Sequence, residues 1–126
     1  MSDTLIAGLA RTPIGRFQGA LAGVAATRLG ATALAACLGR TALPATRVKE
    51  VVLGNVLGAG LGQAPARQAA LAAGLPASVA AQSIDKVCGS GLQALISGAR
   101  ALALAEADFV LAGGQESMSQ APFLLK

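Results

Sequence analysis

The sequence predicts an α/β fold in which helices cover a small, mainly parallel sheet. Short apolar segments, one of them rich in valine, alternate with longer segments rich in alanine and leucine. Glycine or proline stands between successive segments except at 106–108. Strand–helix alternation of this kind is typical of right-handed βαβ units. Since 126 residues are within the usual size of one domain, we expect one compact unit over residues 1–126.

Four strands alternate with three helices in the expected order of elements. Leu29, Leu34 and Leu38 recur at roughly helical spacing in the first helix, and Gly39 is its candidate C-cap. Pro65 suits the start of the second helix, where the missing N–H costs no helical hydrogen bond. The predicted elements are a strand over 5–9, a helix over 26–38, a strand over 48–56, a helix over 65–73, a strand over 79–87, a helix over 90–105 and a strand over 109–112.

The third predicted helix is apolar on every face. Its sequence over 91–105, GLQALISGARALALA, carries one charge, Arg100. A helix that is hydrophobic all round is buried all round, and one open sheet of four strands does not cover both of its sides. We therefore expect a second covering layer, supplied by a further segment or by a partner. The alternative, an alanine-rich surface helix, needs a polar stripe that this sequence lacks.

Composition excludes several classes of protein. With 54% hydrophobic and 13% charged residues, the chain is not intrinsically disordered. Three Phe without Tyr or Trp, and ten scattered basic residues, argue against a nucleic-acid partner. The charge-free run 68–84 is broken by Pro76, and no basic region precedes the first apolar stretch, so we expect a cytoplasmic protein with no membrane span. Without histidine or a zinc-type cysteine pattern, we expect no metal site.

Cys88 is the candidate nucleophile. It lies in DKVCGSG (85–91), where a predicted strand gives way to glycines and the third predicted helix. Backbone N–H groups and the dipole at a helix N-terminus favour the thiolate, which is the nucleophilic form of a cysteine. Flanking glycines let a substrate carbonyl approach the backbone. A buried structural cysteine is the other interpretation, and the local sequence leaves both open.

A nucleophilic cysteine normally works with a base, and the chain has no histidine to supply one. Asp85 and Lys86 are close in sequence, but neighbouring side chains of an extended segment point to other faces. Glu116 is a candidate base whose position the sequence does not fix. Cys37 lies in the alanine- and leucine-rich first helix and is predicted to be a core cysteine.

Two glycine-containing loops are further candidates. Segment 58–62 resembles a phosphate-binding loop but lacks the lysine and the spacing of the nucleotide-binding motifs, so we favour a plain strand-to-helix connection. Segment 113–119 follows the last predicted strand, at the edge where ligand sites of parallel sheets lie. Its glycines are equally compatible with a tight turn.

Four motifs together resemble the N-terminal portion of a thiolase, and within that family the acetyl-CoA acetyltransferase branch. They are ARTPIGRF (10–17), GNVLGAGLGQAPARQAAL (54–71), KVCGSGLQA (86–94) and GGQESMSQAPF (113–123). The motifs stand in the family's order and spacing, and the match runs nearly end to end, so the resemblance is specific.

The resemblance implies a thiolase-like βαβαβαβ N-terminal half-domain, part of a five-layered α-β-α-β-α fold whose third helix lies between two sheets. It implies that Cys88 carries the acyl group and that its backbone N–H contributes to an oxyanion hole. The implied reaction is the Claisen condensation of two acetyl-CoA to acetoacetyl-CoA, or the reverse thiolysis, as in fatty acid metabolism. Coenzyme A thioesters are then substrates, with no separate cofactor. Dimers, with strand 79–87 near the twofold axis, or tetramers are expected.

In the family, the catalytic histidine, a second catalytic cysteine, an oxyanion-hole asparagine and most coenzyme A contacts lie in segments that would follow Lys126. We therefore expect the chain to be incomplete for turnover by itself. One alternative is a catalytically inactive truncated thiolase that serves as an interaction or structural piece. Another is a ketoacyl-synthase-like condensing enzyme, against which the segments ARTPIGRF and GGQESMS favour a thiolase.

Overall fold

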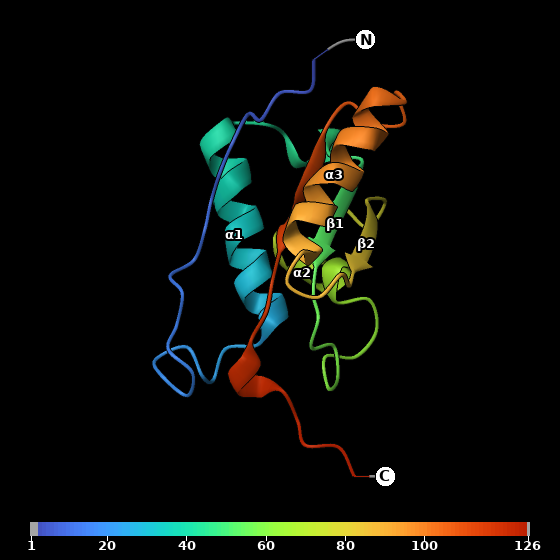
Figure 1. The fold of residues 1–126 in the computed structure, drawn as a ribbon. Coiled ribbons are helices and arrows are strands. Elements are labelled where there is room, and N and C mark those ends of the chain that lie inside the picture. Colours follow the sequence, from blue (N-terminus) through green and yellow to red (C-terminus); the bar gives the residue numbers. More distant parts are fainter. Residues whose placement is uncertain (1–2, 126) are drawn as a thin grey trace.

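The computed structural model describes residues 3–125. Three helices and three strands follow one another in the order α1 (Ala26–Thr41), β1 (Glu50–Gly54), α2 (Pro65–Ala72), β2 (Ala80–Ile84), α3 (Ser90–Ala103) and β3 (Val110–Gly114), with short 3-10 turns at Ala45–Arg47 and Met118–Gln120 (Figure 1). The α/β class and the alternation predicted from the sequence are confirmed.

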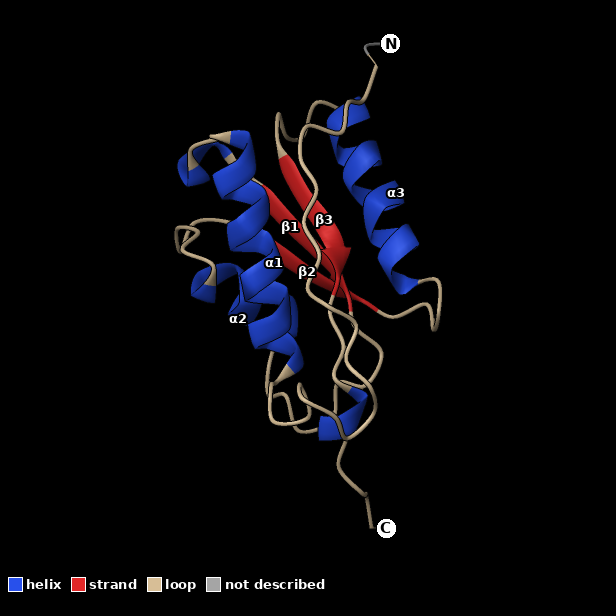
Figure 2. Cartoon of the chain, turned by 90° about the vertical axis from the view of Figure 1, so that its left-hand side faces the viewer, coloured by secondary structure: helices blue, strands red, loops and turns tan. Residues whose placement is uncertain are grey.

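The strands form a parallel sheet in the order β2-β1-β3. At its carboxyl edge, Gly54 of β1 pairs with Ile84 of β2 and with Gly114 of β3. Helices α1 and α2 lie on one face of the sheet and α3 lies on the other (Figure 2). Because all three strands run in one direction, the loops that follow them meet at one edge, and these loops hold the candidate site.

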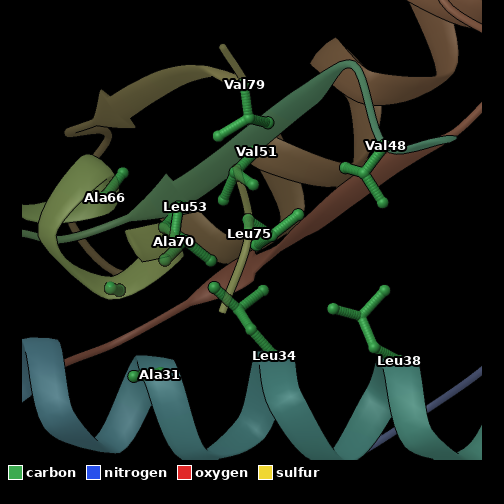
Figure 3. Packing of buried hydrophobic residues seen from close by; sticks show 11 residues of the cluster. Ala31, Leu34, Leu38, Val48, Val51, Leu53, Ala66, Ala70, Leu75 and Val79 are labelled. Atoms are coloured by element: carbon green, nitrogen blue, oxygen red, sulfur yellow. The ribbon is translucent and has the colours of Figure 1, made fainter. Parts of the chain in front are cut away.

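The core lies between the sheet and the pair α1–α2. Val51 and Val52 of β1 are fully buried, and Val51 faces Leu34 and Leu38 of α1 and Leu75 (Figure 3). Since successive side chains of a strand point to opposite faces, Val52 belongs to the α3 side. The central strand is therefore buried on both faces, as its valine-rich sequence indicates.

The predicted strand over 5–9 is wrong. This segment is extended but pairs with no strand of residues 3–125, and Leu5, Ile6 and Leu9 are exposed. It runs along α1 (Figure 1), where Arg40 Nη1 donates a 2.7 Å hydrogen bond to Leu9 O. A strand needs a hydrogen-bonded neighbour, and an apolar β-type sequence by itself does not provide one.

Two predicted helix and strand ends also move. Helix α1 continues through Gly39 to Thr41, and the left-handed residue that ends it is Ala42, with φ of 52°. Strand β2 stops at Ile84, three residues before the predicted end, because the following residues form the tight turn that carries Cys88.

Helix α3 is covered on one face within residues 3–125. Its buried residues are small, and a Cβ on Gly98 would lie only 3.0 Å from Val110 Cγ1 of β3. The opposite face exposes Leu92 by 65%, Leu95 by 46% and Ile96 by 38%. The predicted burial of α3 on every side is therefore not reached within residues 3–125. These three exposed residues mark the surface that the predicted second layer would cover.

No helix among residues 3–125 combines the length and apolarity that crossing a bilayer requires.

Candidate active site at the carboxyl edge of the sheet

Three loops at the carboxyl edge enclose an open hollow of about 480 Å³. One loop follows each strand: 55–57 after β1, 87–91 after β2 and 114–118 after β3. Cys88, Asn55 and Glu116 all line this hollow. The structure thus brings together the candidate nucleophile and the candidate base from segments more than two dozen residues apart.

Cys88 lies in a tight turn between β2 and α3, and its side chain is exposed and free of any disulfide. Gly89 N donates to Lys86 O at 3.0 Å and Ser90 N donates to Val87 O at 3.1 Å, which closes the turn around Cys88. Within residues 3–125 the Cys88 N–H has no hydrogen-bond acceptor. A free donor beside an exposed thiol is the arrangement that binds a developing oxyanion next to a nucleophile.

The turn is held by a buried hydroxyl, that of Ser90. The Ser90 residue is 4% exposed. Its hydroxyl accepts a 2.8 Å hydrogen bond from Lys86 N and donates a 2.6 Å hydrogen bond to Val87 O. Val87 has φ of 50°, a left-handed conformation that is strained for a β-branched residue. Ser90 therefore supports a strained backbone one residue before the thiol.

Close packing also fixes the start of α3. A Cβ on Gly54, the last residue of β1, would lie 2.6 Å from Gly91 N and 2.7 Å from Ser90 Cβ. Only glycine permits this approach of a strand end to a helix N-terminus. The end of the central strand and the first turn of α3 thus form one rigid unit beneath Cys88.

Glu116 does not lie free as a base for Cys88. Its carboxylate accepts hydrogen bonds from Asn55 Nδ2 at 2.9 Å, from Val56 N at 2.8 Å and from Leu57 N at 3.2 Å. These donors occupy both carboxylate oxygens. The candidate base is instead a clamp that joins the loop after β3 to the loop after β1.

Two buried polar residues next to this clamp, Asn55 and Gln115, were not among the residues predicted from the sequence. Asn55 is 7% exposed and Gln115 is 6% exposed, and Gln115 Nε2 donates to Asn55 Oδ1 at 3.4 Å. The signal was present, since each is the first residue after a strand of a parallel sheet. The burial of Gln115, however, depends on α1, where Gly30 lies against it.

Asp85 and Lys86 have local roles. Asp85 Oδ1 accepts a 2.9 Å hydrogen bond from Val87 N, and Lys86 Nζ donates to Gln93 Oε1 at 2.9 Å. Neither side chain is hydrogen-bonded to Cys88 within residues 3–125. The expectation that they do not serve the thiol is consistent with these contacts.

The glycine-rich loop 58–62 connects β1 to α2, and a side chain of α2 holds it in place. Gln68 Nε2 of α2 donates to Leu61 O at 2.7 Å and to Gln63 O at 2.8 Å. At the start of α2, Pro65 has no N–H and Ala66 N donates to Ser83 Oγ at 3.0 Å. A helix N-terminus whose donors are already used does not offer a phosphate site.

Cys37 is only partly buried, so the prediction of a core cysteine is too strong. It lies on α1 beneath the N-terminal segment, where a Cβ on Gly8 would be 3.4 Å from its Sγ. It belongs to the contact between that segment and α1 and does not line the hollow.

Comparison with known proteins gives a consistent result. Residues 4–126 match the family described as thiolase, N-terminal domain. The chain is 55% identical over 125 residues to a probable acetyl-CoA acetyltransferase of Escherichia coli and 52% identical over 125 residues to an acetyl-CoA acetyltransferase of Pseudomonas aeruginosa, in each case over 99% of this chain and 32% of the relative. The chain thus spans about a third of the length of these relatives.

A solved structure shares the fold. It is a thiolase from Ascaris suum in complex with coenzyme A, with a TM-score of 0.93 and 40% sequence identity, over 94% of this chain and 31% of that one. The family match over residues 4–126 includes the four motifs, the three strands and the residues that line the hollow. The chain therefore belongs to the thiolase family, whose N-terminal domain it matches from residue 4 to residue 126.

Proposed function

We propose that this chain carries the acyl-accepting cysteine of a thiolase and that the protein transfers acetyl groups between coenzyme A thioesters. The observation that carries the proposal is the exposed Cys88 thiol beside its own N–H, which has no acceptor in the described part of the chain, in a hollow at the carboxyl edge of a thiolase-type sheet. The relatives named acetyl-CoA acetyltransferase support acetyl-CoA as the substrate.

The proposed reaction has two steps. In the first, the Cys88 sulfur forms a bond to the acetyl carbon of acetyl-CoA while the bond from that carbon to the coenzyme A sulfur breaks, and coenzyme A leaves as a thiolate. In the second, a second acetyl-CoA, deprotonated at its α-carbon, forms a C–C bond to the acetyl carbon, and Cys88 leaves as a thiolate. Thiolysis of a 3-ketoacyl-CoA is the reverse.

Backbone geometry supports the first step. Attack on a thioester carbonyl places negative charge on its oxygen, and the Cys88 N–H is a fixed donor next to the attacking sulfur. Because Gly54, Gly91 and Ser90 lock the start of α3, this donor needs no rearrangement to meet that charge. We propose no metal and no cofactor besides the thioester substrates.

The proton transfers need groups from outside residues 3–125. The chain has no histidine, and the Glu116 carboxylate is occupied by the 55–57 loop. We propose that the histidine and the second cysteine implied by the thiolase resemblance complete the hollow from its open side. The exposed leucines of α3 supply the surface on which that additional layer packs.

We also propose a homo-oligomer. Strand β2 is at the edge of the sheet, so its outer backbone groups are available to a second copy. Native mass spectrometry tests this assignment, with dimers or tetramers expected and a monomer at micromolar concentration contradicting it.

The experiment that tests the function is isotopic exchange of labelled coenzyme A into acetyl-CoA. Exchange requires a covalent acetyl-protein and does not require the condensation step. We expect the native protein and a Cys37→Ser control to catalyse the exchange, and Cys88→Ser to catalyse none. Exchange that persists in Cys88→Ser would refute Cys88 as the acyl carrier.

The exposed face of α3 favours a second candidate, a catalytically inactive thiolase-like piece that binds a partner through Leu92, Leu95 and Ile96. This candidate predicts no exchange in any variant, together with stable association that is lost when these three residues become polar. The two candidates therefore differ in the exchange assay.

A further inference from the structure

We propose that Glu116 is a positioning residue that sets the wall which loop 55–57 contributes to the Cys88 hollow. The inference rests on the proposed acyl transfer and adds to it a residue that the thiol chemistry itself does not use. Glu116 comes from the loop after β3, whereas the wall it holds follows β1.

The clamp is made of charge-assisted hydrogen bonds to consecutive backbone donors. Val56 N lies 2.8 Å from one carboxylate oxygen, and Leu57 N lies 3.3 Å and 3.2 Å from the two oxygens. Both residues are half-buried, so these N–H groups cost free energy when they lose an acceptor. A carboxylate, which only accepts, is the side chain suited to two parallel backbone donors.

The loop has few other ties within residues 3–125. Asn55 N donates to Ile84 O at 3.0 Å, which fixes the start of the loop to β2, and Gly58 N donates to Val56 O at 3.0 Å inside the loop. Residues 58–60 are exposed. The position of Val56 and Leu57, which line the hollow, therefore depends on the Glu116 carboxylate.

Glu116 also sets the orientation of two buried amides. Asn55 must turn its Nδ2 towards the carboxylate, at 2.9 Å, which leaves its Oδ1 to accept from Gln115 Nε2. The Gln115 Oε1 then faces the α1 side and is buried without a hydrogen-bond partner among the described residues. The Glu116 carboxylate thus determines the orientation of the Asn55 and Gln115 amides as well as the position of the wall formed by loop 55–57.

A residue that positions the wall of the hollow affects the placement of a bound thioester and leaves the reactivity of the Cys88 thiol unchanged. Loss of the clamp should move Val56 and Leu57 and so misplace the acyl group relative to Cys88, whose turn is held separately by Ser90. Misplacement by about 1 Å costs up to about a hundredfold in rate. A small reagent that needs no binding wall should react with Cys88 as before.

The test compares two reactions of Cys88 in the protein as its gene expresses it. Acetylation by acetyl-CoA is followed by quenched intact-mass spectrometry, and alkylation by iodoacetamide is followed by peptide mapping at Cys88. For Glu116→Gln we expect acetylation to slow by about tenfold or more and alkylation to stay within about twofold. The matched control is Glu106→Gln, the same change at an exposed glutamate that does not line the hollow.

Two further variants guard against a folding defect. Glu116→Asp keeps the charge but shortens the side chain, and should acetylate at a rate between the parent and Glu116→Gln. The exchange Asn55→Asp with Glu116→Gln turns the new amide nitrogen to the new carboxylate and leaves the amide oxygen to accept from Val56 N and Leu57 N, so it should recover part of the lost rate.

The outcomes separate the two claims. Equal acetylation rates for the parent and Glu116→Gln, or a parallel loss of alkylation, would overturn the positioning role and leave the proposed function standing. Failure of the exchanged pair to recover any of the lost rate would overturn the backbone clamp. Absence of any acetyl adduct in the parent would overturn the proposed function and this inference with it.

Discussion

Gly54 and Ser90 are packed so closely that a Cβ on Gly54 would lie 2.7 Å from the Cβ of Ser90. The end of the central strand therefore presses directly on the first residue of the helix that follows Cys88. This contact ties the position of the nucleophile to the sheet, and it can be tested from either side.

From the strand side, the test is Gly54→Ala. The added methyl group must displace the backbone of Ser90 or Gly91, so we expect the free energy of unfolding to fall by about 1–3 kcal/mol, together with loss of Cys88 acetylation. Gly58→Ala is the control, because a Cβ there meets no atom of residues 3–125 within 4 Å. Urea unfolding measures both, and equal stabilities of the two variants would contradict the contact.

From the helix side, the test is Ser90→Ala. The variant loses the hydroxyl that bonds Lys86 N and Val87 O, and a buried unpaired backbone group costs about 1–3 kcal/mol. Ser97→Ala, on the same helix with one long hydrogen bond from Gln93, should change stability by less than about 0.5 kcal/mol. If denaturant unfolding finds Ser97→Ala the more damaging change, Ser90 does not hold the turn.

The strained Val87 offers a substitution that should stabilise the protein. Its φ of 50° suits asparagine better than a β-branched residue, and the side chain is 67% exposed, so little packing is lost. We expect Val87→Asn to raise the free energy of unfolding by about 1 kcal/mol. Val87→Ile, also β-branched, should bring no gain. Thermal unfolding measures the stability of both variants. Equal stabilisation by Val87→Ile would contradict the assignment of strain to Val87.

The uncovered face of α3 predicts self-association. Leu92 and Ile96 are exposed, and we expect the isolated 126-residue chain to aggregate or form oligomers through such apolar surface. Leu92→Gln with Ile96→Gln should reduce light scattering, whereas Ala94→Gln, at a position that is 0% exposed, should unfold the protein. A monodisperse monomer of the parent chain in gel filtration would contradict this expectation.

Much of the fold follows from local sequence. Pro65, the valines of β1 and the alanine-rich helices indicate elements that depend on near neighbours, and the structure has them at nearly the predicted positions. Segment 5–9 has the same apolar character and is not a strand, because strand formation requires a paired neighbour that residues 3–125 do not provide. The residue pattern identifies the secondary structure that a segment prefers, and the presence of a hydrogen-bonded neighbouring strand decides whether a β-type segment becomes a strand.

The site divides in the same way. Cys88 was a candidate because its surroundings, a strand, glycines and a helix start, are consecutive in sequence, and the thiolase resemblance implied its role. The role of Glu116 was not predicted, since its partners Asn55, Val56 and Leu57 lie about sixty residues away in the chain. The strain at Val87 also escaped prediction, because it results from hydrogen bonds of Asp85 and Ser90 that only the folded turn reveals.

The central claim, that Cys88 takes up the acetyl group, is tested most directly by intact-mass spectrometry after incubation with acetyl-CoA. We predict a single acetyl adduct on the parent protein and none on Cys88→Ser. An adduct that persists in Cys88→Ser, or its absence from the parent as its gene expresses it, would contradict the assignment of Cys88 as the acyl carrier.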